Sequence, residues 1–144
     1  MTSVHLVLGI SVLLLSLAGG VWGGYCWLKE RASQGFWYLL RAQQSAVAVQ
    51  VMLGTLLLFL GKNAGNDLHY LYGGLPLVVS LFAEGARAGA ATQELGDTDF
   101  DALAPERQRL LAIAIVRRET GIMALSCIVI FFLALRAAGT SPEF

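Results

Sequence analysis

Residues 4–28 read VHLVLGISVLLLSLAGGVWGGYCWL and contain no Asp, Glu, Lys or Arg. A transmembrane helix needs roughly 20 consecutive apolar residues, because each residue adds about 1.5 Å toward a hydrocarbon core about 30 Å thick. The stretch is long enough for this, and it lacks the basic start of a signal peptide. It therefore predicts a membrane-spanning helix that is retained in the protein.

Three further apolar stretches follow, which we predict as helices over about 36–60, 68–90 and 105–137. Pro105 suits the first turn of the last helix, whose early residues form a cytoplasmic extension of its membrane part. The polar segment 91–104 is predicted as a cytoplasmic loop. We therefore expect residues 1–144 to form a single domain of the all-α class, an integral membrane four-helix bundle.

The composition agrees with a membrane protein located in the cell membrane, with the lipid bilayer as its first partner. Hydrophobic residues make up 56% of the chain and charged residues only 14%, against about a quarter in a soluble domain. The ten basic and ten acidic residues cancel, which argues against nucleic acid as a partner. Cys26 and Cys127 are too few for a disulfide scaffold or a zinc site, and we expect free, packed thiols.

The distribution of Lys and Arg predicts the orientation. The second loop, after residue 60, holds only Lys62, and the C-terminal tail holds only Arg136. The remaining eight basic residues lie in or beside the first and third loops (Lys29, Arg31, Arg41, Arg87, Arg107, Arg109, Arg117 and Arg118). Basic loops stay in the cytoplasm, so both the N-terminus and the C-terminus are predicted to lie outside.

Polar side chains gather at the predicted cytoplasmic end. They are Arg41, Gln43, Gln44, Glu84, Arg87, Arg117, Arg118 and Glu119. Glu84 and Arg87 are one helical turn apart, a spacing that allows an ion pair. Anchoring with local ion pairs is favoured over an ion path. The acidic run from Glu94 to Asp101 is predicted as a solvated loop rather than a metal site, because it has no histidine partner.

The two histidines occupy matched positions. His5 and His69 open the first and third predicted helices, at the same membrane depth, and Gly9 and Gly73 follow each by four residues on the same helical face. Gly54 of the second helix lies at a similar depth. We expect these glycines to clear one pocket beneath the histidines for a flat ligand with two axial imidazoles. The alternative is a pair of interfacial histidines and ordinary helix-packing glycines.

A resemblance bears on this choice. Residues 50–61 read QVMLGTLLLFLG, and residues 67–69 after a short outer loop read DLH. This resembles the haem A synthase family, in which a helix bearing Gln-x-x-Leu-Gly is followed by an outer loop and a helix opening with Leu-His. The histidine of that pair is a haem ligand in the family. The family's preceding helix also starts outside with a ligand histidine, which His5 matches.

The resemblance implies haem as a cofactor, with His5 and His69 as iron ligands. The positions of Gly9, Gly54, Gly73 and Gln50 in the predicted helices place these residues around it. Gln50 lies near the middle of the membrane and is expected to bond a neighbouring helix or a cofactor edge. The residues around His5 depart from the family's pattern, and the chain supplies one four-helix half where the family joins two. The carboxylate implicated in the family's oxygenating catalysis is missing, so the resemblance does not extend to catalysis.

We therefore predict a small membrane protein that binds one haem b near the outer surface, for electron transfer, haem handling or sensing. Its partners would be a membrane redox complex or further copies of itself. The alternative is a cofactor-free accessory or assembly subunit of a larger membrane complex. A small transporter is less favoured, because the middle of the membrane contains no charged residue in the predicted topology. No nucleotide-binding loop or catalytic triad is present, so an enzyme is not expected.

Overall fold

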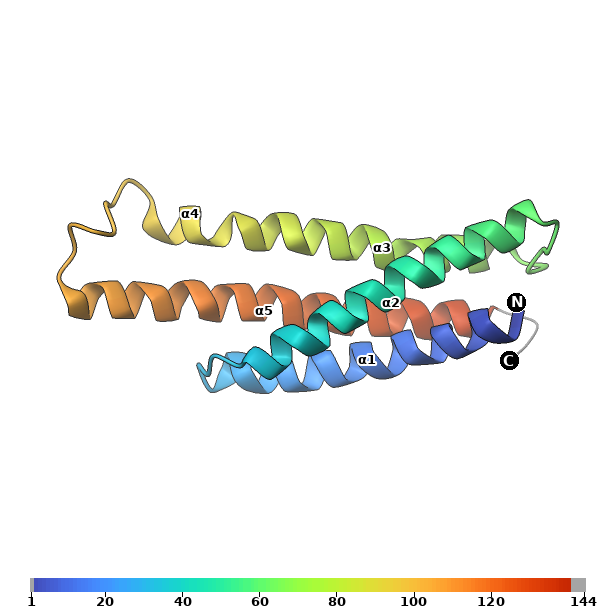
Figure 1. The fold of residues 1–144 in the computed structure, drawn as a ribbon, viewed down its shortest axis with the longest axis horizontal. Coiled ribbons are helices and arrows are strands. Elements are labelled where there is room, and N and C mark those ends of the chain that lie inside the picture. The colour runs from blue at the N-terminus through green and yellow to red at the C-terminus, as the bar shows by residue number, and fades with distance from the viewer. Residues whose placement is uncertain (1, 141–144) are drawn as a thin grey trace.

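The computed structural model describes residues 2–140 of the chain, and these contain helices and no strands. The elements are α1 (Thr2–Leu28), α2 (Gln34–Phe59), α3 (Asp67–Ala88), α4 (Ala90–Leu95) and α5 (Pro105–Ala138). Figure 1 shows α1, α3 and α5 running alongside one another, with α2 crossing them obliquely. The four long helices begin and end close to the predicted bounds.

Local sequence explains where the helices begin. Ser33 precedes α2 with extended backbone, and its hydroxyl accepts a hydrogen bond from the amide of Phe36. Asn66 caps α3 in the same way, accepting from the amide of Leu68 at 3.0 Å. Such side chains satisfy amides that lack an intrahelical partner. Pro105 opens α5 as predicted, since the first helical position needs no amide hydrogen.

Helix α5 is the centre of the bundle. It packs along both α1 and α3, and α1 packs against α2, whereas α2 and α3 meet over a shorter stretch. Small residues bring α1 and α5 together: a Cβ atom on Gly20 would lie 2.7 Å from Cγ1 of Ile128. Close approach through glycine is common between helices in membranes, where dispersion contacts replace the hydrophobic effect.

The surface is apolar and part of the interior is polar. Val7, Leu14 and Val21 recur along α1 with 61–67% of their surface exposed, whereas Gln43 of α2 is fully buried. Helices α1, α2 and α5 are long and apolar enough to cross a membrane. Helix α3 is not among these; besides apolar residues it contains Asp67, His69, Glu84 and Arg87. The described residues thus support a membrane protein with three such helices.

The segment predicted as the loop 91–104 differs from the expectation. Its first residues belong to α4, a short helix separated from α3 by Gly89. Arg118 of α5 contacts this short helix. Its guanidinium forms an ion pair with Glu94 at 2.8 Å and also donates a hydrogen bond to Gln93. A contact between residues so distant in sequence is not visible in local pattern. The irregular part of the connection is therefore 96–104.

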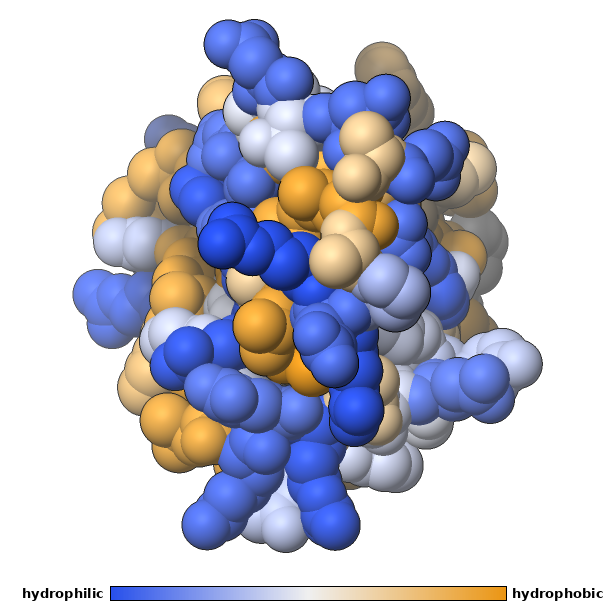
Figure 2. All heavy atoms as spheres, turned by 90° about the vertical axis from the view of Figure 1, so that its left-hand side faces the viewer, coloured by the Kyte–Doolittle hydropathy of each residue, from blue (hydrophilic) through white to orange (hydrophobic). Residues whose placement is uncertain are grey.

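The two ends of the bundle differ in chemistry. The start of α1, the end of α2, the start of α3 and the end of α5 lie together at one end (Figure 1), which we call the histidine end. The opposite end carries the α1–α2 connection, α4 and the start of α5, and we call it the arginine end. Figure 2 looks onto the arginine end, where hydrophilic side chains surround a few apolar ones.

Candidate functional site

The structure brings the two histidines together at the histidine end. His5 lies in the first turns of α1 and His69 in the first turn of α3. Their ring centroids are 6.1 Å apart, with an angle of 61° between the ring planes. Residues far apart in sequence thus place two imidazoles side by side, both half-buried.

His69 is held by the backbone of α5. Its Nδ1 lies 3.0 Å from the carbonyl oxygen of Ala137. A carbonyl oxygen only accepts, so this bond places the proton on Nδ1 and leaves Nε2 as the unprotonated nitrogen of a neutral ring. A histidine that binds a metal in proteins usually donates its other ring N–H in this way.

His5 is held by the side chain of Gln50. The Nε2 atoms of the two residues are 3.3 Å apart, so the Gln50 amide donates to the ring when that ring nitrogen carries no proton. Oε1 of Gln50 is buried without a hydrogen-bond partner among the described residues. Gln50 thus bonds across to a neighbouring helix, and its amide retains an unused acceptor at the site.

One cavity of about 540 Å³ lies beside these side chains. All six residues singled out in the sequence line it: His5, Gly9, Gln50, Gly54, His69 and Gly73. The volume falls within the range of about 300–1,000 Å³ typical of small-molecule and cofactor sites. Most of the lining is apolar, with a few polar groups, and this also fits such a site.

The three glycines all line the cavity, but two of them also face a neighbouring side chain. A Cβ on Gly54 would lie 3.1 Å from Cε1 of His5, and one on Gly9 would lie 3.2 Å from Nε2 of Gln50. Gly54 of α2 therefore makes room for the His5 ring, and Gly9 makes room for Gln50 instead of clearing space beneath His5. Gly73 has no atom near its Cβ position and borders the open cavity, as expected.

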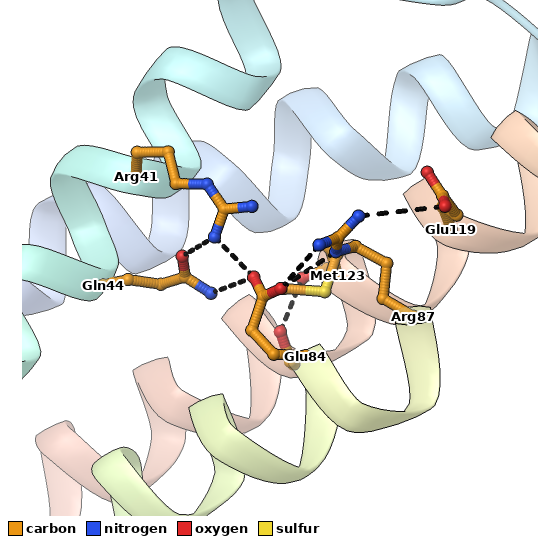
Figure 3. Close-up of polar contacts among 7 residues, drawn as sticks. Arg41, Gln44, Glu84, Arg87, Glu119 and Met123 are labelled. Atoms are coloured by element: carbon orange, nitrogen blue, oxygen red, sulfur yellow. Dashed lines mark hydrogen bonds and ion pairs between the residues drawn. The ribbon is translucent and has the colours of Figure 1, made fainter. Parts of the chain in front are cut away.

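A second polar cluster lies toward the arginine end (Figure 3). Glu84 of α3 accepts hydrogen bonds from Arg41 at 2.6 Å and Gln44 at 2.8 Å, both on α2. The predicted pair of Glu84 with Arg87 is confirmed at 2.9 Å, and Arg87 also lies 3.8 Å from Glu119 of α5. This cluster, which we call the Glu84 cluster, joins three helices with opposite charges that face one another.

Gln43 was expected within this polar group, and the structure places it elsewhere. Its side chain is fully buried, and its Nε2 donates to the Ser16 hydroxyl of α1 at 3.1 Å. Gln43 and Gln44 are adjacent in sequence, so their side chains point to different neighbours around α2. The prediction of free thiols is confirmed, because Cys26 and Cys127 are unbonded and buried.

Sequence reasoning missed Lys62 as part of the site. This lysine lies in the loop between α2 and α3 and lines the same cavity as His69 and Tyr70. From the sequence, Lys62 entered only the count of basic residues that predicts the orientation. Its position in the short loop that precedes the Leu68–His69 pair was the available signal.

Among residues 2–140, no group of three or more His, Cys, Asp or Glu side chains is arranged to hold a metal ion. Two imidazoles are the number that an iron held by a porphyrin takes from the protein. Comparisons with models of known protein families, with curated proteins and with solved structures give no match. The resemblance to the haem A synthase family therefore stays a prediction based on short motifs.

Proposed function

We propose that this protein binds one haem b through His5 and His69 near the outer surface of the cell membrane. In this proposal α3 is the fourth membrane span, and both termini lie outside. The distance between the two rings carries the proposal. Both imidazoles border one cavity and their centroids are 6.1 Å apart, so the two residues would be able to hold one haem iron between them.

The environment of each ring also supports axial ligation. The Ala137 carbonyl orients His69 with Nε2 as its lone-pair nitrogen. Gln50 meets Nε2 of His5, so binding through that atom requires the Gln50 amide to turn toward another partner. The apolar walls of the cavity suit the flat body of a porphyrin.

The ligand set indicates which role the site serves best. Haem supplies reversible one-electron chemistry when it is bound. With an imidazole on each side, the protein would occupy both axial positions and leave no open one for oxygen. Electron transfer is therefore favoured over oxygen activation. The protein's own contribution is to orient the imidazoles and to exclude water with an apolar cavity.

An absorption spectrum tests this directly. The protein is purified in detergent from cells supplied with haem precursor, and its oxidised and reduced spectra are recorded. We expect a Soret band and sharp reduced α and β bands typical of six-coordinate, low-spin haem. A colourless protein that also fails to bind added hemin would overturn the proposal and favour the accessory subunit.

Single histidine variants test the ligand pair. His69→Ala and His5→Ala should each remove one axial ligand, lowering hemin affinity about tenfold or more, since even loss of an outer partner of a ligand costs about 10–100-fold. Added imidazole should restore the low-spin spectrum in either variant. A low-spin spectrum that is unchanged in His5→Ala without added imidazole would show that His5 is not a ligand.

A further inference from the structure

We propose that Lys62 binds a carboxylate of the haem at the outer mouth of the cavity, an inference that rests on the proposed function. The ligand would then have an apolar body between α1, α2 and α3 and an anionic edge in the α2–α3 loop. This assigns a role to a residue outside the histidine and glycine pattern. It also means that the carboxylate edge of the porphyrin faces the outer surface of the membrane.

The charge of the cavity lining supports this assignment. Lys62 is the one Lys, Arg, Asp or Glu among the described residues that line the cavity. An anionic edge placed deeper would be taken out of water without a positive partner, and isolated buried charges are costly. At the mouth beside Lys62, such an edge would stay in contact with water and would also have a positively charged partner.

Lys62 has no competing acidic partner in the described part of the chain. Arg41, Arg87, Arg117 and Arg118 each lie within ion-pair distance of a Glu side chain. No such pair includes Lys62, whose side chain is exposed. Its ammonium group is therefore available to an incoming carboxylate, whereas these four arginines already have partners.

The loop that carries Lys62 is fixed by hydrogen bonds. The Lys62 amide donates to the carbonyl of Leu57 at 3.0 Å, closing the end of α2, and Gly61 supplies the positive φ of 74° that this turn requires. The Ala64 amide donates to the Tyr70 hydroxyl at 2.9 Å, which ties the loop to α3. A backbone held at both sides lowers the ordering cost when the side chain binds.

The experiment compares two lysine variants and two porphyrins. Lys62→Gln removes the charge and keeps a side chain of similar length, and Lys29→Gln is the matched control, because Lys29 is the other lysine of the chain and lies at the arginine end. Each protein is titrated in detergent with hemin and with hemin dimethyl ester, whose carboxylates are blocked. The Soret band reports binding, and the low-spin bands report histidine ligation.

We expect Lys62→Gln to weaken hemin binding about three- to tenfold, the effect of a partly exposed charged contact, and to leave binding of the ester unchanged. Lys29→Gln should bind both porphyrins as the wild type does. The wild type itself should bind the ester more weakly than hemin, a comparison that needs no variant to fold.

The outcomes separate this inference from the proposed function. A wild type that binds neither porphyrin overturns both. Low-spin binding of hemin that is equally strong in the wild type and in Lys62→Gln leaves the proposed function in place and overturns the role of Lys62. An equal loss of hemin and ester binding in Lys62→Gln also overturns it, because the effect would then not depend on the carboxylates.

Discussion

At the scale of single residues, the two histidines are held unequally. His69 bonds a main-chain carbonyl of α5, which moves only if the helix moves. His5 meets a glutamine side chain and lies against Gly54. A side chain turns more readily than a helix backbone, so in the proposed haem complex we expect the contact of His5 with Gln50 to change more than the contact of His69 with α5.

Gly73 is the residue whose substitution best tests the cavity. Because the space at its Cβ position is open, Gly73→Leu should fill part of the cavity without displacing a neighbour. We expect loss of hemin binding by at least about tenfold, with the thermal midpoint in detergent changed little, since leucine also favours helix over glycine by up to about 1 kcal/mol.

Gly85 provides the matched control for this variant. It lies on the same helix, has equally open space at its Cβ position and does not line the cavity. Gly85→Leu should retain full hemin binding. If Gly73→Leu binds hemin as well as Gly85→Leu does, the cavity beside Gly73 is not where the porphyrin lies.

At the scale of elements, the Glu84 cluster connects α2 and α3, which otherwise have few contacts with each other. Helices α2 and α3 contact each other over a short stretch, and Glu84 of α3 accepts hydrogen bonds from two side chains of α2. The Arg87 guanidinium also stacks near the Trp37 ring of α2, 5.7 Å from its centroid. Polar contacts of this kind are effective between helices whose other contacts are sparse.

Removing the Glu84 carboxylate should loosen α3 from α2. Glu84→Ala leaves Arg41 and Arg87 facing each other without the shared acceptor, and we expect a loss of about 1–2 kcal/mol in the free energy of unfolding. Thermal unfolding in detergent, followed by circular dichroism, measures this. At low temperature, where the histidine end stays folded, Glu84→Ala should keep the hemin spectrum of the wild type.

The exposed pair of Glu30 with Arg117 supplies the comparison for Glu84. Its atoms are 2.9 Å apart, but both side chains are 52% exposed, so Glu30→Ala should cost less than about 1 kcal/mol. Equal thermal shifts in the two variants would mean that the Glu84 cluster contributes no more than an ordinary surface pair.

At the scale of the whole molecule, all three apolar spans and α3 run between the same two ends. The arginine end has a hydrophilic surface over its loop and helix extensions (Figure 2). Eight of the ten Lys and Arg residues lie at or beside this end, and segments rich in Lys and Arg tend to stay in the cytoplasm. The proposed topology therefore places the histidine end, with its cavity, outside.

Labelling of an introduced cysteine tests that topology. Thr98 lies in the 96–104 connection at the arginine end and is exposed. In a variant whose Cys26 and Cys127 are replaced, Thr98→Cys should react with an impermeant maleimide only after the cells are opened. Asn63→Cys, at the opposite end, should react in intact cells. The reverse pattern would place both histidines at the inner surface.

The sequence by itself determined the helices and the pairing of the histidines in depth. Long apolar stretches, Pro105 and the Glu84–Arg87 spacing are local patterns, and local patterns specify where helices lie and which residues share a face. Helical spacing and depth pointed to Gly9, Gly54 and Gly73 and to Gln50 and, together with the resemblance, to His5 and His69; all six residues line one cavity.

Only the tertiary structure decided which side chains meet across helices. Four features depend on the rotation and register of one helix against another. They are the contact of Gly54 with His5, the hydrogen bond of Gln43 to Ser16, the ion pair of Arg118 with α4 and the place of Lys62 beside the cavity. Close packing at small residues such as Gly20 sets that register. A periodicity along one helix carries no information about the rotation of its neighbour, so these contacts emerge only when the helices are packed.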